Sequence, residues 1–182
     1  MRVITLDEAL LRQHCKVLQE QIEAMYHPDL IIGIATGGVK VAEYMFGDVP
    51  HITVTCRRPS TKTKENAEGV MCIVRCLPVS VRNFMRMVEA FIMRIRKKEQ
   101  VLSVEFLEEA MPEAKRVLVV DDAVDSGRTL KSVLEALNGG PEVRSATITI
   151  TTSSPYVAPD YYLYNDKTLI RFPWSKDYRH EE

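Results

Sequence analysis

Uninterrupted apolar segments alternate along this chain with segments in which apolar residues recur at helical spacing. Residues 30–35 and 117–120 contain no polar side chain, which is typical of strands that a parallel sheet buries on both faces. Residues 52–56 alternate with period two, as in a strand near a sheet edge, and residues 146–152 have strand composition. This order predicts an α/β fold, with a Rossmann-like parallel sheet of about five strands flanked by helices.

The N-terminal segment is predicted to form an amphipathic helix of about twenty residues. Thr5 and Glu8 form a capping-box pattern at its start, and Pro28 follows its end. The residues expected on its apolar stripe are Leu6, Leu10, His14, Val17, Leu18, Gln21, Ile22 and Met25.

The middle of the chain is expected to hold a long polar loop and an insert of helices. Residues 58–69 are small, polar and basic, so we expect an exposed, flexible loop that returns through a strand at residues 70–76. Residues 79–98 predict an amphipathic helix, and a shorter helix is predicted around residues 101–110. The basic face of the long helix is interpreted as a solvated face or a dimer contact, in preference to a nucleic-acid or membrane contact.

Length and composition indicate one globular domain over residues 1–182. The formal net charge of -1 gives no reason to expect a nucleic-acid binder. Neither a membrane-spanning apolar run nor a signal-peptide core occurs, so we expect a cytoplasmic protein without membrane contact. The cysteines are Cys15, Cys56, Cys72 and Cys76, without metal-site spacing. Cys56 and Cys72 could pair across a hairpin, but free thiols are the preferred interpretation.

Candidate chemistry is concentrated after the strand at residues 117–120. Asp121 and Asp122 are expected at its end, and Asp125 precedes Ser126-Gly127-Arg128-Thr129, after which a helix begins. Such a turn can bind phosphate on free backbone N–H groups, and the carboxylates can hold a polyol or a metal ion. A second glycine turn, Thr36-Gly37-Gly38, is expected on the same carboxyl edge of the sheet. Helix-capping carboxylates, or magnesium ligands of another phosphate enzyme, are the alternatives; the P-loop pattern is absent.

Together these motifs resemble the type I phosphoribosyltransferase family, which binds 5-phosphoribosyl-1-pyrophosphate (PRPP). Residues 117–129 resemble the family's 13-residue signature, residues 35–38 its pyrophosphate loop, and residues 58–69 its catalytic loop. Phe172-Pro173-Trp174, within a hood expected over residues 153–182, resembles the xanthine-guanine branch. The resemblance covers residues 28–177, except for the helical insert at residues 79–110.

The resemblance implies transfer of phosphoribose from PRPP to a nitrogenous base, with Mg²⁺ as cofactor, pyrophosphate as product and a homodimer as assembly. It assigns the 5'-phosphate to Asp125, Ser126, Gly127, Arg128 and Thr129, and pyrophosphate to Thr36, Gly37 and Gly38, with a cis peptide in that loop as an option. It assigns the ribose hydroxyls and the metal to Asp121 and Asp122, and proton exchange with the base to Asp125. It assigns closure over the pyrophosphate to Arg57, Arg58, Lys62 and Lys64.

The base pocket departs from the family pattern. Thr151 stands where the xanthine-guanine branch has a lysine that reads the 6-oxo group, and Leu169 stands where an aromatic residue stacks on the purine. Ile170 could offer backbone groups and Trp174 a ring, so a 6-oxopurine is the default acceptor. A non-catalytic PRPP- or nucleotide-binding regulatory protein, acting through the 79–110 helices, is the alternative.

Overall fold

The computed structural model describes residues 3–57, 103–106 and 113–175. The chain divides into two compact units, Met1–Cys56 with Val104–Glu182 and Arg57–Ser103. All described residues except Arg57 and Ser103 belong to the first unit. The predicted loop at residues 58–69, the strand at 70–76 and the helix at 79–98 therefore lie outside the described residues.

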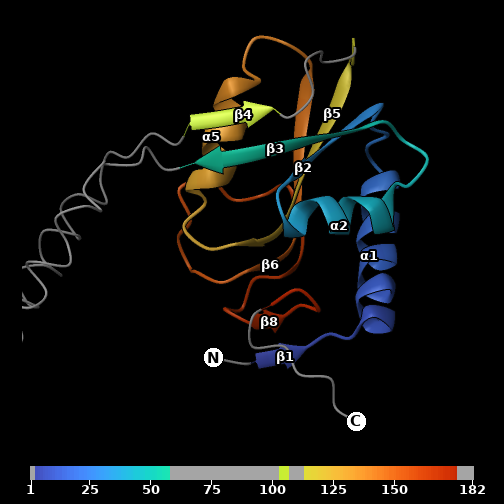
Figure 1. Ribbon diagram of the computed structural model, residues 1–182, viewed down its shortest axis with the longest axis vertical. Helices are drawn as coiled ribbons and strands as arrows, with labels where there is room; N and C mark the ends of the chain where they lie inside the picture. Colours follow the sequence, from blue (N-terminus) through green and yellow to red (C-terminus); the bar gives the residue numbers. More distant parts are fainter. Residues whose placement is uncertain (1–2, 58–102, 107–112, 176–182) are drawn as a thin grey trace, which may run out of the picture. The chain divides into compact units, whose positions relative to one another are not determined.

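The first unit contains a six-stranded sheet in the order β4-β3-β2-β5-β6-β7 (Figure 1). The pairs β2–β3, β2–β5, β5–β6 and β6–β7 are all parallel. The strands are β2 (Leu30–Ile34), β3 (His51–Arg57), β4 (Ser103–Phe106), β5 (Arg116–Val124), β6 (Glu142–Ile150) and β7 (Tyr161–Tyr164). The predicted α/β class is confirmed, with more strands than the five expected.

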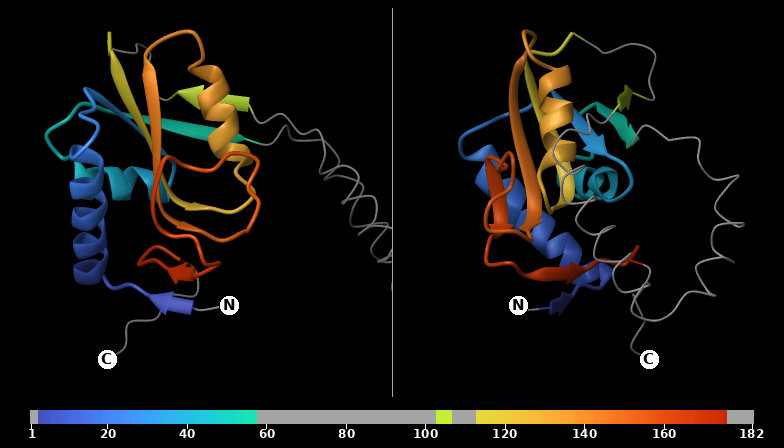
Figure 2. Two further views of the ribbon diagram at one scale, coloured as in Figure 1. Left: turned by 180° about the vertical axis from the view of Figure 1, so that it is seen from behind. Right: turned by 90° about the vertical axis from the view of Figure 1, so that its left-hand side faces the viewer.

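Helices cover both faces of this sheet (Figures 1 and 2). Helices α1 (Glu8–Glu23) and α2 (Gly37–Met45) pack against one face, and α5 (Arg128–Ala136) packs against the other. The central strand β5 contributes to both hydrophobic cores, because its side chains point alternately to the two faces of the sheet. Leu118 and Val120 join the cluster with α1 and α2, whereas Val117 and Val119 join the cluster with α5. The prediction that residues 117–120 are buried on both faces is confirmed.

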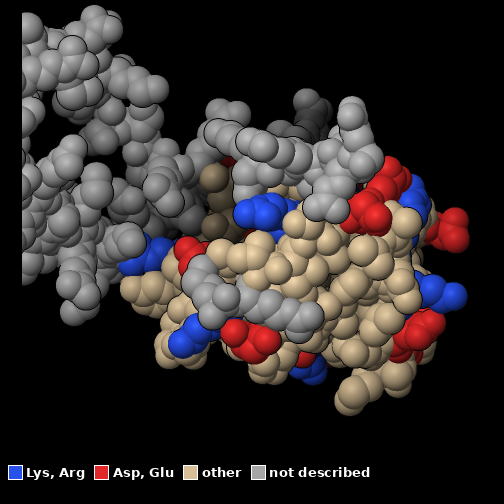
Figure 3. All heavy atoms as spheres, turned by 90° about the horizontal axis from the view of Figure 1, so that it is seen from below, with Lys and Arg blue, Asp and Glu red and all other residues tan. Residues whose placement is uncertain are grey.

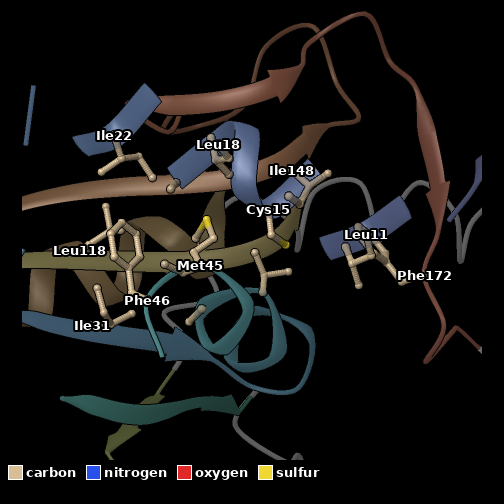
Figure 4. Close-up of a cluster of buried hydrophobic side chains, with 14 of the residues drawn as sticks. Leu11, Cys15, Leu18, Ile22, Ile31, Met45, Phe46, Leu118, Ile148 and Phe172 are labelled. Atoms are coloured by element: carbon tan, nitrogen blue, oxygen red, sulfur yellow. The ribbon is translucent and has the colours of Figure 1, made fainter. Parts of the chain in front are cut away.

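The larger core lies between α1, α2 and the sheet (Figure 4). Leu11, Cys15, Leu18 and Ile22 project from α1 toward Ile31, Leu118 and Ile148 of the sheet, with Met45 and Phe46 from the α2 side. Burial raises the pKa of the Cys15 thiol to about 12, so this cysteine is an apolar core residue rather than a reactive one.

Two details of α1 differ from the prediction. Asp7 is the N-cap and its Oδ1 accepts the N–H of Leu10 at 2.7 Å, so the Thr5–Glu8 capping box does not form. The buried stripe runs through Leu11 and Cys15, while Leu10 and Val17 are 42% and 44% exposed. Apolar residues occur on two neighbouring stripes of this helix, and only packing decides which one faces the sheet.

Two predicted segments also adopt other structure. Residues 103–106, assigned to a helix, form β4, because Val104 and Phe106 alternate with polar residues and pack against the second core. The C-terminal tail, expected to be irregular, contains β7 and β8 (Leu169–Arg171). β8 pairs in parallel with β1 (Val3–Thr5), forming a separate two-stranded sheet (Figure 2).

Candidate active site

The acidic pair lies inside the last part of β5 rather than after it. β5 continues through Asp121 and Asp122 to Val124, because Ala123 and Val124 still pair with Thr149 and Ile150 of β6. Each carboxylate accepts a backbone N–H from the next residue, Asp122 N to Asp121 Oδ1 and Ala123 N to Asp122 Oδ1, both at 2.9 Å. The two side chains are therefore held at the carboxyl edge of the central strand.

Burial and crowded negative charge raise pKa values at the acidic pair and beside it. Burial, and then the negative charge of Asp122, raises the pKa of Asp121 well above the usual range of an aspartate. Burial, assisted by Asp121, also raises the pKa of the Cys56 thiol at the end of β3. Crowded negative charge of this kind favours binding of a cation or of hydrogen-bond donors.

The Thr36-Gly37-Gly38 turn meets the acidic pair on this edge. Ala35 and Thr36 are exposed, the peptide bond between them is cis, and both glycines are buried at the start of α2. A Cβ on Gly37 would lie 1.9 Å from Asp122 Oδ2, and one on Gly38 would lie 2.3 Å from the carbonyl oxygen of Val120. Only glycine permits this approach, so the turn and the acidic pair form one continuous surface.

The second turn of the signature leads directly into α5. Gly127 caps the helix with φ +73°, and a Cβ there would lie 2.6 Å from the carbonyl oxygen of Val157. Asp125 and Ser126 are exposed, whereas Arg128 and Thr129 are partly buried. The first N–H groups of a helix have no acceptor within that helix, so this end of α5 can bind an anion.

Tyr156 secures the same turn from the C-terminal segment. Its N–H donates to the carbonyl oxygen of Ser126 at 2.8 Å. Its ring lies 4.8 Å from the guanidinium carbon of Arg128, whose Nη2 donates to the Tyr156 hydroxyl at 3.0 Å. The segment after β6 is thus bound to the turn at residues 125–129.

The residues assigned to the base gather in part around Asp125. Thr151 Oγ1 donates to Asp125 Oδ1 at 3.2 Å, which brings these two predicted residues together. Leu169 and Ile170 lie in β8, and Thr149 Oγ1 donates to the carbonyl oxygen of Thr168, just before β8, at 2.8 Å. This bond connects the start of β8 to the end of β6, two residues before Thr151.

Trp174 reaches the acidic pair instead of extending into open space. Its Nε1 donates to Asp122 Oδ2 at 2.8 Å, and its ring stacks on Phe172 with centroids 5.0 Å apart. Of the residues assigned to closure, Arg57 ends β3, and Arg58, Lys62 and Lys64 lie outside the described residues.

Several contacts of this site were not predictable from sequence order. Neither the Trp174–Asp122 bond nor the approach of Cys56 to Asp121 has a signal in the spacing of the residues. Lys40, whose Nζ lies 5.3 Å from the centroid of the Trp174 ring, was also missed. Its position three residues after Gly37 places it one helical turn along α2, which is the only hint that the sequence offers.

Charge elsewhere on the described part is mixed. On the face seen in Figure 3, acidic and basic side chains form small separate groups among other residues. Within residues 3–57, 103–106 and 113–175, no three His, Cys, Asp or Glu side chains gather as a metal site. None of the helices described there is long and apolar enough to cross a membrane.

The fold and this edge of the sheet are typical of α/β proteins that bind a phosphorylated ligand at the carboxyl ends of parallel strands. Residues 6–181 match the phosphoribosyl transferase domain, and the chain belongs to this family. It is therefore a phosphoribosyltransferase, a pentosyltransferase that uses PRPP, and the predicted family is confirmed.

Solved structures of low sequence identity share this fold. The purine phosphoribosyltransferase from Pyrococcus horikoshii OT3 is 23% identical, with a TM-score of 0.62 and 100% of each chain covered. The xanthine-guanine-hypoxanthine phosphoribosyltransferase from Helicobacter pylori is 17% identical, with a TM-score of 0.67, covering 97% of this chain and 96% of that one. A hypothetical protein from Neisseria gonorrhoeae with bound ppGpp is 18% identical, with a TM-score of 0.62 and coverages of 97% and 91%. Comparison with curated proteins gives no match.

Proposed function

We propose that the protein transfers 5-phosphoribose from PRPP to a purine base and releases pyrophosphate. The observation that carries the proposal is the contact of Gly37 with Asp122, because it joins the pyrophosphate turn and the ribose-binding carboxylates on one edge. The α5 start at Gly127 provides the third element that PRPP needs, a donor-rich end for the 5'-phosphate.

Each part of PRPP then has its own residues. The 5'-phosphate lies on the N–H groups of residues 125–129, with the Ser126 and Thr129 hydroxyls and the Arg128 guanidinium as further donors. Pyrophosphate lies on the backbone of Thr36, Gly37 and Gly38, with Arg57, Arg58, Lys62 and Lys64 closing over it. Asp121 and Asp122 accept hydrogen bonds from the ribose hydroxyls.

The acidic pair also fits a magnesium ion. Mg²⁺ is commonly held by one or two carboxylates together with substrate oxygens. Burial, and then the charge of Asp122, raises the pKa of Asp121, and a bound cation would offset both effects. When bound, Mg²⁺ supplies positive charge that neutralises the pyrophosphate leaving group. Asp121 and Asp122 are the residues that would hold it.

We assign proton exchange with the base to Asp125. Its side chain is exposed beside Thr151, and the hydrogen bond from Thr151 Oγ1 orients one carboxylate oxygen. As the bond between the anomeric carbon and pyrophosphate breaks, the base nitrogen forms the new bond and gives up its proton to Asp125. Backbone donors and the closing basic residues stabilise the departing charge and exclude water.

The acceptor we propose is a 6-oxopurine. Thr151, Leu169 and Ile170 are the residues assigned to it, whereas Trp174, which the sequence resemblance also assigned to the base, donates to Asp122 instead. The names of similar solved structures, purine and xanthine-guanine-hypoxanthine phosphoribosyltransferases, support a purine. Because Thr151 replaces the lysine that reads the 6-oxo group, we expect weak discrimination between 6-oxopurines and adenine, which carries an amino group at that position.

The test is a panel of bases supplied with PRPP and Mg²⁺, with the nucleotide products separated by chromatography. We expect a mononucleotide from at least one 6-oxopurine, and one from adenine at a rate within about tenfold of it, since the missing donor leaves little selection for a 6-oxo group. Products from pyrimidines alone would contradict the purine assignment.

A second candidate is a nucleotide-sensing protein that binds but does not transfer. It is favoured by the structural similarity to the Neisseria gonorrhoeae protein with bound ppGpp. Calorimetry with PRPP and with guanine nucleotides, alongside the base panel, separates the two: tight binding without any product supports the sensor. We also propose a homodimer, to be tested by light scattering of the purified chain.

A further inference from the structure

The turn that carries Trp174 is closed by hydrogen bonds and packed on the core. Phe172 N donates to Ser175 Oγ at 3.0 Å, and Ser175 N donates to the carbonyl oxygen of Phe172 at 2.9 Å. Phe172 is 3% exposed and belongs to the larger core (Figure 4). The rings of Phe172 and Trp174 are parallel within 5°. The core therefore sets the direction of the indole N–H.

That N–H holds one of the two oxygens of Asp122. Trp174 Nε1 donates to Oδ2 at 2.8 Å, while the backbone N–H of Ala123 donates to Oδ1 at 2.9 Å. Two donors fixed on different segments determine the plane of the carboxylate. A hydrogen bond to an ionised acceptor is also stronger than a neutral one.

The start of α2 packs against the same hydrogen bond. A Cβ on Gly37 would lie 1.9 Å from Asp122 Oδ2 and 2.8 Å from Trp174 Nε1. The Nζ atom of Lys40 lies 5.3 Å from the centroid of the Trp174 ring, within cation–π range. Phe172 stacks on one ring face and the indole N–H donates to Asp122, so both contacts hold Trp174 between the core and the acidic pair.

We propose that Trp174 is a positioning residue for the donor substrate: it fixes the Asp122 carboxylate in the orientation that receives the ribose hydroxyls of PRPP. The C-terminal turn thereby acts on PRPP affinity and not on stacking of the base. The inference rests on the proposed function, in which Asp122 contacts the ribose. A carboxylate ordered in advance loses less freedom on binding, which increases affinity.

The variant Trp174→Phe removes the donor but keeps an aromatic ring against Phe172. Calorimetry with PRPP and Mg²⁺ should show a dissociation constant raised about tenfold or more, the scale for losing a hydrogen bond to a charged group. The KM for the base should stay unchanged and the KM for PRPP should rise. Tyr162→Phe is the matched control, because it removes a hydroxyl from the same C-terminal segment whose partner is Asn165; its PRPP affinity should equal that of the wild type.

Two results would overturn the inference: an unchanged dissociation constant for PRPP in Trp174→Phe, or a change confined to the KM of the base. Trp174 is the only tryptophan of the chain, so the wild-type emission gives a test without any variant. We expect it to shift as PRPP with Mg²⁺ saturates the protein, and constant emission at saturation would also overturn the inference. Calorimetry measures binding without transfer, so a protein that binds PRPP but converts no base would refute the proposed function and leave this inference standing.

Discussion

Three carboxylates within five residues have different surroundings. Asp121 is partly buried and crowded by Asp122, Asp122 is held by an indole, and Asp125 is exposed beside a hydroxyl. Identical side chains are thereby suited to different tasks, since environment decides whether a carboxylate binds a cation, fixes a polyol or exchanges a proton.

Asp125→Asn should lower kcat by about 10²–10⁴, the range for loss of one acid–base group. The amide keeps the shape of the side chain, and Thr151 can still donate to its oxygen, so PRPP affinity should change little. Steady-state kinetics together with calorimetry checks both parts. Wild-type kcat in this variant would show that another group exchanges the proton.

The raised pKa of Asp121 predicts a pH dependence of stability. The folded, ligand-free protein keeps a proton on Asp121 at pH values where the unfolded chain has lost it. Because the native state binds more protons, the free energy of unfolding falls as the pH rises from the ordinary aspartate range through the raised pKa. Urea unfolding across this window should show that fall in the wild type and a smaller one in Asp121→Asn. An equal fall of unfolding free energy with pH in the two proteins would show that Asp121 does not cause the pH dependence.

At the scale of elements, the buried strands were predictable and the faces of α1 were not. The uninterrupted apolar residues of β2 and β5 leave no polar face, so their burial follows from composition. In α1, Leu10 and Leu11 both fit an apolar stripe, and the choice depends on the sheet that the helix packs against. The strands β4, β7 and β8 were missed for a similar reason: each is short, and its pairing comes from distant segments.

The register of α1 can be tested with two adjacent leucines. Leu11→Ala should lower the free energy of unfolding by about 2–5 kcal/mol, because Leu11 is fully buried. Leu10→Ala, at a position 42% exposed, should cost less than about 1 kcal/mol. Denaturant unfolding of both variants measures these losses. A larger loss of unfolding free energy in Leu10→Ala than in Leu11→Ala would show that the stripe predicted from sequence faces the sheet.

The start of α2 should not accept a side chain. Gly37→Ala places a methyl group against Asp122 Oδ2 and Trp174 Nε1, so we expect weaker PRPP binding and a loss of about 1–3 kcal/mol in stability from overpacking. Gly47→Ala, just beyond the other end of α2, is the control, because its Cβ would meet only the carbonyl oxygen of Glu43 at an ordinary 3.5 Å. If Gly37→Ala binds PRPP as tightly as Gly47→Ala, the turn does not touch the ligand.

At the scale of the molecule, the site is assembled from segments far apart in the sequence. Gly37, Asp122 and Trp174 meet at one hydrogen bond, although well over a hundred residues separate the first from the last. The signature at residues 117–129 and the turn at 36–38 could be assigned to one edge because parallel strands share their carboxyl ends. The contact between Trp174 and Asp122 could not be predicted, because the position of Trp174 depends on how the C-terminal segment folds back over that edge.

The central claim is transfer of phosphoribose from PRPP to a base, and pyrophosphate release tests it most directly. The wild-type chain is incubated with PRPP and Mg²⁺, first without a base and then with hypoxanthine, guanine or xanthine, and free pyrophosphate is measured over time. We predict slow release without a base and rapid release, matched one to one by mononucleotide, with at least one 6-oxopurine. Pyrophosphate release that no purine or pyrimidine accelerates would contradict the account.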